Sequence, residues 1–137
     1  MTNFFSKDNL LKFLEEIFPQ VNEKIEILKL EREIALVKLR VSNDDLRPGG
    51  TISGPSMFLL ADVSFYIAIL NLIGKEPLAV TTNCSINFIR KPKPNDLVAE
   101  ARILKRGQSL IYGDVMLKSK DENTKVAHAV FTYSVPK

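Results

Sequence analysis

The 137-residue sequence has few of the residues on which many enzymes build their sites. It contains one cysteine, Cys84, and one histidine, His128. A single cysteine excludes an internal disulfide framework and a cysteine cluster for zinc, and it is compatible with a reducing compartment. Cys84 falls in an apolar stretch, where a small buried side chain is the ordinary expectation. We therefore expect no metal site and a cytoplasmic protein.

Several motifs are absent as well. Without a G-x-S-x-G turn, a triad built on His128 is disfavoured, and a structural role is expected for this residue. The sequence has no glycine-rich dinucleotide or phosphate loop. Its net charge of +3 is too small to indicate nucleic acid, and its basic residues are not interleaved with aromatic ones. No basic segment followed by an apolar run opens the chain, so no signal peptide is predicted.

One long apolar segment is present, from Met57 to Ile73. Pro55 before it and Gly74 after it predict a helix that starts at Pro55, ends at Ile73 and is about 28 Å long. This length approaches that of a membrane span, but Asp62 near its middle would cost roughly 2.5–3.5 kcal/mol in a bilayer. A helix that is apolar on nearly every face is then expected to be buried in a protein core, with no membrane partner.

The rest of the chain predicts one amphipathic helix and six strands. The helix covers residues 7–18, with Ser6 as its N-cap and Pro19 as its stop. Periodicity, and at 78–90 an abundance of β-branched residues, predicts strands at 24–30, 34–41, 78–90, 97–105, 110–118 and 124–135, the last four as an antiparallel meander. This order indicates a single α+β domain over residues 1–137, in which a curved antiparallel sheet of about six strands wraps the long helix. The remaining face of the helix is expected to meet another subunit.

The start of the long helix and the one carboxylate within it, Asp62, are the candidate catalytic groups. A helix N-terminus offers unpaired N–H groups, and Gly54 lets a ligand oxygen approach closely, so the pair suits an oxyanion. Asp62 can attack a carbonyl or activate water. The alternative is a structural Asp62 that caps a neighbouring loop or pairs with Arg47. Most other carboxylates are expected on solvated faces.

The run from Arg47 to Pro55, continued through Leu60-Ala61-Asp62, resembles the signature of hotdog-fold thioesterases of the PaaI type, within the 4-hydroxybenzoyl-CoA thioesterase superfamily. The matching positions are Gly50-Thr51, Gly54 and Asp62. The resemblance implies a hotdog fold and an acyl-CoA thioesterase, with coenzyme A as part of the substrate and no other cofactor. It implies that the Gly54 N–H polarises the thioester carbonyl. It further implies that Asp62 of the facing subunit is the general base or nucleophile, in a homodimer that pairs into a tetramer.

Three positions depart from that signature: Arg47 replaces an Asn, Ser53 a His and Pro55 a second Gly. Ser53 can donate a hydrogen bond but does not titrate near pH 7. Arg47 can pair with Asp62 and weaken it as a base, or it can bind a substrate oxygen or carboxylate. These departures keep open a second hypothesis, a catalytically weak hotdog protein that binds acyl-CoA or a similar ligand.

The resemblance also implies residues on the substrate side. Thr81 matches a hydroxyl that holds the attacking water. The coenzyme A nucleotide and its phosphates are expected near Arg90, Lys91 and Lys93 and near the loop of Gly107 and Ser109. A solvated basic loop is the alternative for these lysines and Arg90. The acyl group is expected between the partner subunit and Phe58, Phe65 and Tyr66.

Overall fold

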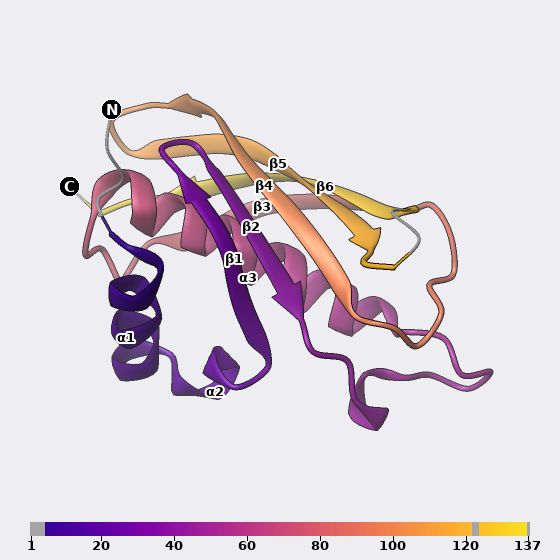
Figure 1. Ribbon diagram of the computed structural model, residues 1–137. Coiled ribbons are helices and arrows are strands. Elements are labelled where there is room, and N and C mark those ends of the chain that lie inside the picture. The colour runs from indigo at the N-terminus through magenta and orange to yellow at the C-terminus, as the bar shows by residue number, and fades with distance from the viewer. Residues whose placement is uncertain (1–4, 122–123, 137) are drawn as a thin grey trace.

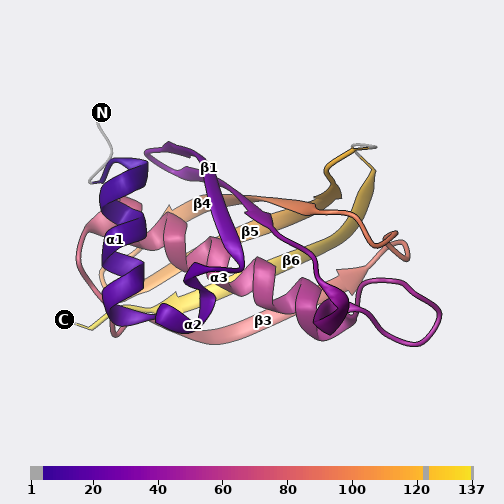
Figure 2. The same cartoon turned by 60° about the horizontal axis from the view of Figure 1, so that its bottom comes forward.

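The computed structural model describes residues 5–121 and 124–136. Its helices are α1 (Lys7–Ile17), α2 (Pro19–Asn22), the short 3₁₀ helix η1 (Asn43–Asp45) and α3 (Gly54–Ile73). Its strands are β1 (Ile25–Glu31), β2 (Ile34–Leu39), β3 (Val80–Phe88), β4 (Leu97–Arg106), β5 (Leu110–Ser119) and β6 (Lys125–Ser134). The sheet curves over α3, while α1 lies at one end of the molecule and the loop before α3 projects from the other (Figures 1 and 2). The predicted α+β class is confirmed.

The strand order is β1-β2-β4-β5-β6-β3, and every neighbouring pair is antiparallel. The predicted meander of the last four strands is therefore wrong in one respect. Strands β4, β5 and β6 form a meander, but β3 pairs with β6 at the edge, and β4 pairs with β2. The connection from β3 to β4 contains Pro92 and Pro94. Such a segment is too long and too rigid for a tight hairpin turn.

Helix α3 starts at Gly54, one residue before the predicted start, and Ser53 is its N-cap. Its side chains are mostly buried, and it lies across β2, β4 and β5. By length and composition α3 could cross a membrane, yet 67% of its most apolar window is buried inside the fold. That burial is typical of a core helix.

One stripe of α3 remains uncovered by its own chain. It contains Phe58, which is 38% exposed, and the half-buried Leu59 and Asp62. These positions share one helix face because Asp62 follows Phe58 by four residues and Leu59 by three. The stripe lies on the side of β3, an edge strand that is largely exposed. The open face of α3 and the free edge of β3 therefore form one continuous uncovered region.

The N-terminal helix ends earlier than predicted. Ser6 caps α1 as expected, since its hydroxyl accepts a hydrogen bond from the Asn9 N–H at 3.1 Å. The Phe18 N–H then bonds to the Leu14 carbonyl and closes α1 at Ile17. Pro19 does not only stop α1. It also starts α2, because its fixed φ suits the first position of a helix.

Close packing of α3 on the sheet depends on Gly113 in β5. A Cβ at this position would lie 2.1 Å from the Arg102 carbonyl oxygen and 2.5 Å from the Phe65 ring. We expect Gly113→Ala to lower the free energy of unfolding by about 1–3 kcal/mol, because the strands or the helix must move apart. Urea denaturation measures this change. Lys105→Ala, on an exposed position of β4, is the control and should change stability by less than about 0.5 kcal/mol. An unchanged midpoint for Gly113→Ala would contradict this account of the packing.

Candidate functional site

The first turn of α3 leaves one N–H group available. The Ser56 N–H donates to the Ser53 hydroxyl at 3.2 Å, and the Met57 N–H donates to the Ser53 carbonyl. Pro55 has no N–H. In the part of the chain that the structure describes, the Gly54 N–H donates to no carbonyl or side chain. Because helix N-termini carry a partial positive charge, this group is a preorganised donor for a negatively charged oxygen.

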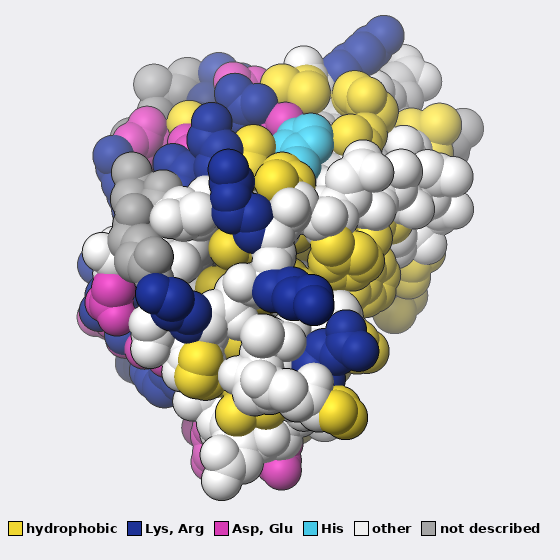
Figure 3. All heavy atoms as spheres, turned by 90° about the vertical axis from the view of Figure 1, so that its right-hand side faces the viewer, with side chains coloured by type: hydrophobic (Ala, Val, Ile, Leu, Met, Phe, Trp, Pro, Cys, Tyr) yellow, Lys and Arg dark blue, Asp and Glu magenta, His cyan; other side chains and the backbone are white. Residues whose placement is uncertain are grey.

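A pocket of about 440 Å³ opens beside Gly54. A Cβ on Gly54 would lie 3.4 Å from the Phe88 ring, so this ring stands at the start of the helix. Three cations, Arg47, Arg90 and Lys91, contribute to a lining that contains no carboxylate. Figure 3 shows this end of the molecule, where Lys and Arg side chains lie around exposed hydrophobic ones. The pocket is therefore suited to a ligand with both anionic and apolar parts.

Asp62 lies in a different polar environment, two turns further along α3. The Thr81 hydroxyl donates to its Oδ1 at 2.6 Å, and the Tyr133 hydroxyl donates to the same oxygen at 2.8 Å. Burial, followed by the Asp62 charge, raises the pKa of Tyr133 far above its usual value, so this phenol remains a donor. These residues line a second pocket of about 450 Å³, together with Tyr66. One carboxylate oxygen is thus held in place, and the other has no hydrogen-bond partner among the described residues.

Within one chain, Gly54 and Asp62 cannot act on the same carbonyl. They are eight positions apart on one helix, which corresponds to about 12 Å along the axis. A carbonyl bound by one group would need to lie within about 3 Å of both the donor and the attacking atom. The two groups also line different pockets. A site that used both groups on one carbonyl would therefore need one of them from a second copy of the chain.

The three residues predicted to contact the acyl group lie in different parts of the structure. Tyr66 lines the Asp62 pocket and donates to the Pro77 carbonyl. Phe58 is exposed on the open stripe of α3. Phe65 does not line either pocket, since it is fully buried and stacks on Phe131 at 5.3 Å. Its assignment to the acyl pocket is corrected, because the apolar sequence of α3 did not indicate which side chains face the sheet.

The predicted nucleotide-binding residues lie at opposite ends of the sheet in one chain. Arg90 and Lys91 line the Gly54 pocket, and Lys93 follows in the same exposed segment. Gly107 and Ser109 lie in the β4–β5 turn, next to the end of β6 and the start of β3. Nine residues of β3 separate the two groups, a distance of roughly 30 Å. One chain does not bring them together.

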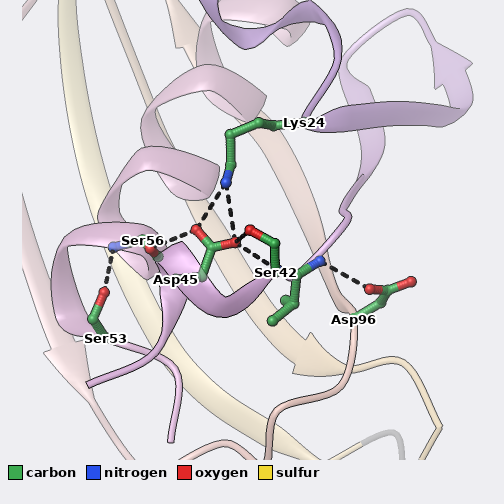
Figure 4. A network of polar contacts seen from close by, with 7 residues as sticks. Lys24, Ser42, Asp45, Ser53, Ser56 and Asp96 are labelled. Atoms are coloured by element: carbon green, nitrogen blue, oxygen red, sulfur yellow. Dashed lines mark hydrogen bonds and ion pairs between the residues drawn. The ribbon is translucent and has the colours of Figure 1, made fainter. Parts of the chain in front are cut away.

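The expectation that Asp62 is the exceptional carboxylate is wrong, because Asp45 and Asp114 are more buried. Burial alone would raise the pKa of Asp45, but bonds from the Ser42 N–H, the Ser56 hydroxyl and Lys24 outweigh it, and the pKa lies below its usual value. Figure 4 shows this network. The Asp114 pKa is likewise lowered, since bonds from Arg102 and His128 outweigh its burial. Sequence patterns missed both residues, because their partners come from distant segments.

Three single-residue expectations have definite outcomes. Arg47 forms no hydrogen bond or ion pair with Asp62 among the described residues, and instead it lines the Gly54 pocket. His128 bonds to Asp114 at 2.9 Å on the sheet face away from α3, which agrees with a structural role. Cys84 is half-buried on β3 rather than fully buried, and burial raises the pKa of its thiol. The described residues include no group of three or more His, Cys, Asp or Glu suited to a metal ion.

Comparison with known proteins identifies the family of this chain. The model of the thioesterase superfamily matches residues 49–126, more than half of the chain. The chain belongs to the thioesterase superfamily. As a superfamily member it is a thioester hydrolase by class, and the match includes Gly54, Asp62 and Thr81.

Solved structures agree with this assignment. A putative thioesterase from Silicibacter sp. TM1040 is 47% identical, covers 100% of this chain and 96% of its own, and has a TM-score of 0.92. The PaaI protein of E. coli is 23% identical over 91% of this chain and 94% of its own, with a TM-score of 0.78. A hypothetical thioesterase of Streptococcus pneumoniae, solved with coenzyme A, is 24% identical over 92% of this chain and 96% of its own, with a TM-score of 0.79. The last two share the fold, and the predicted hotdog architecture is confirmed.

The hydrogen bonds of Asp114 with Arg102 and His128 predict how the stability of this protein depends on pH. The carboxylate accepts hydrogen bonds from Arg102 at 3.0 and 2.8 Å. Because its folded-state pKa lies below the unfolded value, its stabilisation is complete above about pH 4–5 and is lost as the pH falls through the folded-state pKa. We expect Asp114→Asn to cost about 1.5–3 kcal/mol of unfolding free energy at pH 7.

Urea unfolding at pH 7, 5, 4 and 3 measures this prediction. The difference between the wild type and Asp114→Asn should shrink toward pH 3, whereas the exposed control Asp121→Asn should change stability little at any pH. A difference that stays constant from pH 7 to pH 3 would show that the Asp114 charge contributes nothing.

Proposed function

We propose that the protein is an acyl-CoA thioesterase whose active site is shared between two copies of the chain. The observation that carries the proposal is the pair formed by the available Gly54 N–H and the oriented Asp62 carboxylate. One group binds a developing oxyanion and the other directs the attacking oxygen. Both lie within the region matched by the superfamily model.

Pairing of two β3 strands supplies the second copy. Strand β3 is an exposed edge, and such an edge is a template for another strand. The Gly54 end of α3 lies beside Phe88, at the end of β3, whereas Asp62 bonds to Thr81 near its beginning. An antiparallel β3–β3 pair therefore brings Gly54 of one copy toward Asp62 of the other. The same contact covers Phe58 and the open stripe of α3.

The chemistry then follows from the two polar groups. The Gly54 N–H hydrogen-bonds the thioester oxygen as it gains negative charge. Asp62 of the other copy takes a proton from water, and the water oxygen bonds to the carbonyl carbon. When the tetrahedral intermediate collapses, the carbon–sulfur bond breaks and coenzyme A leaves as a thiolate that is then protonated. In the nucleophilic variant, Asp62 itself attacks the carbonyl carbon, the carbon–sulfur bond breaks and releases the coenzyme A thiolate, and water then hydrolyses the resulting anhydride to the free acid and the Asp62 carboxylate.

The same pairing supports coenzyme A as the leaving group. It moves Arg90 and Lys91 of one copy toward the β4–β5 turn of the other, which contains Gly107 and Ser109. Cations near a turn with exposed backbone groups suit phosphate oxygens. The S. pneumoniae thioesterase solved with coenzyme A has the same fold, which supports a coenzyme A ligand here. A further pairing of dimers into a tetramer is part of the proposal.

Release of free thiol from short, medium, long and aryl acyl-CoAs tests the proposal. We expect Asp62→Ala to lose at least about 10²-fold in kcat, because a general base contributes about 10²–10⁴-fold. Asp121→Ala, an exposed carboxylate, should retain full activity. Gly54→Ala and Gly54→Pro isolate the donor, since both place a side chain before Pro55 but only proline removes the N–H. We expect Gly54→Pro to turn over about 10²–10³-fold more slowly than Gly54→Ala.

Each outcome of that assay has a definite meaning. Full activity of Asp62→Ala would exclude Asp62 as the catalytic group. Equal rates for Gly54→Ala and Gly54→Pro would exclude the N–H as the oxyanion donor. Tight binding of acyl-CoA with no turnover on the whole panel would favour the alternative function, a catalytically weak hotdog protein that binds acyl-CoA. The departures at Arg47 and Ser53 are the features that favour that alternative.

Arg47 is assigned to the substrate, because it lines the pocket of Gly54 rather than that of Asp62. For an acyl group that ends in a carboxylate, such as succinyl-CoA, we expect Arg47→Ala to raise KM about 10- to 100-fold, the loss of one charged hydrogen bond. KM for the uncharged butyryl-CoA should change by less than about 3-fold. Steady-state kinetics on both substrates measures the difference, with Arg32→Ala as an exposed control. Higher activity of Arg47→Ala on both would instead indicate that Arg47 pairs with the partner's Asp62.

A further inference from the structure

Asp45 connects the loop before α3 to the helix. Its carboxylate Oδ1 accepts a hydrogen bond from the Ser56 hydroxyl at 2.8 Å, and Oδ2 accepts one from the Ser42 N–H at 2.9 Å. Lys24 lies 3.0 Å from both oxygens. The backbone carbonyl of Asp45 accepts the Ser53 N–H at 2.7 Å. Figure 4 shows how these groups converge from the start of β1, the end of β2 and the first turn of α3.

A charged group at this position needs an explanation, because Asp45 is only 2% exposed. A carboxylate removed from water destabilises a protein unless its lone pairs are satisfied. The donors from Lys24, Ser42 and Ser56 provide that satisfaction, and they require an acceptor with two oxygens. The site is therefore specific for a carboxylate and not only for a polar side chain.

Three hydrogen bonds join Asp45, Ser53 and Ser56 in a closed ring next to Gly54, which we call the Asp45 ring. The Asp45 carbonyl binds the Ser53 N–H, the Ser53 hydroxyl accepts the Ser56 N–H, and the Ser56 hydroxyl returns to the Asp45 carboxylate. Ser53 is thereby held extended, with φ −73° and ψ 154°. The ψ of Ser53 sets the plane of the peptide that carries the Gly54 N–H, so the ring, together with the Met57 N–H that donates to the Ser53 carbonyl, sets the direction of that donor.

The rest of the loop is anchored mainly at Ile52, whose side chain is buried and whose N–H donates to the Pro92 carbonyl at 3.3 Å. Arg47 to Gly50 are exposed, and Gly49 and Gly50 have positive φ values of 100° and 80°. The bridge between Leu46 and Ile52 joins the two arms of the loop to each other. The Asp45 ring, in contrast, joins the loop to the first turn of α3, and Lys24 joins Asp45 to the residue before β1. Together with the Ile52–Pro92 bond, these contacts fix the loop relative to the site.

We propose that Asp45 is a positioning residue for the oxyanion donor, which it orients through Ser53 and Ser56 without touching the substrate. This inference rests on the proposed function, in which the Gly54 N–H binds the thioester oxygen. Lys24 completes the arrangement. Its charge offsets that of Asp45, which would otherwise oppose the negative charge that develops beside the helix start.

Asp45→Asn tests the inference because the amide has nearly the same size but only one acceptor oxygen and no charge. We expect kcat to fall about 10- to 100-fold, since small displacements of a catalytic group have effects of this size. KM should stay within about 3-fold, because the acyl-CoA pockets are unchanged. Asp114→Asn is the matched control, a buried and paired aspartate on the other face of the sheet, and its kcat should stay within about 2-fold of the wild type.

The Gly54 amide provides a readout that does not depend on turnover. In ¹⁵N–¹H spectra of the full-length protein, Asp45→Asn should shift or broaden the Gly54 resonance, and Asp114→Asn should not. If Asp45→Asn does not fold, Ser56→Ala opens the same ring by one bond and should lower kcat about 3- to 10-fold. Restoring the hydroxyl with Ser56→Thr should recover most of this loss.

The inference and the proposed function fail in different ways. A folded Asp45→Asn variant with wild-type kcat and an unchanged Gly54 resonance would overturn the positioning role, as would an effect confined to KM. If the wild type hydrolyses no acyl-CoA, the proposed function fails. The Gly54 resonance then still decides whether Asp45 orients this amide.

Discussion

Burial of helix α3 is the constraint on which the rest of the structure depends. A helix that is apolar on nearly every face cannot be covered by one layer, so the sheet must curve around it (Figure 2). The contact leaves no room for a side chain at Gly113, where the Phe65 ring meets β5. Even so, one chain covers only part of the circumference. The uncovered stripe at Phe58 and Asp62 is where the candidate chemistry lies.

The two ends of the candidate site meet different physical requirements. At Gly54 the backbone must present an N–H that no group among residues 5–121 and 124–136 satisfies, and the loop must hold it still. At Asp62 a carboxylate must be oriented without losing all of its acceptor capacity, and Thr81 and Tyr133 do this by binding the same oxygen. One helix contains both groups, yet its rigidity keeps them about 12 Å apart. The rigidity that fixes each group thus prevents a single chain from using both.

Much of this arrangement could be predicted from the sequence because it depends on local signals. Pro55 and Gly74 fix the ends of α3 to within one residue, and alternation locates the six strands. The spacing of Gly54 and Asp62 follows from their membership of one helix. The resemblance to hotdog thioesterases implied that the Thr81 hydroxyl holds the attacking water, but its 2.6 Å contact with Asp62 is seen only in the folded chain.

What could not be predicted depends on contacts between distant segments. Alternation gives no information on which edge a strand joins, so β3 was placed beside β4 instead of β6. The uniform apolarity of α3 hid the inward direction of Phe65. Tyr133 follows from the β3–β6 register, which only the folded sheet reveals. Asp45 and Asp114 could not be recognised as buried, because a carboxylate is buried only where distant donors converge on it.

The position of Asp45 bears on how this chain accommodates a serine at residue 53. A serine N-cap satisfies the Ser56 N–H through its own hydroxyl and so leaves the Gly54 N–H for a ligand. A short hydroxyl, however, has little surface with which to hold the loop in place. Asp45 takes on that task, because its backbone carbonyl accepts the Ser53 N–H and its buried carboxylate accepts a hydrogen bond from the Ser56 hydroxyl. The serine and the aspartate therefore act as one unit, and either residue changed alone would disturb the direction of the same N–H.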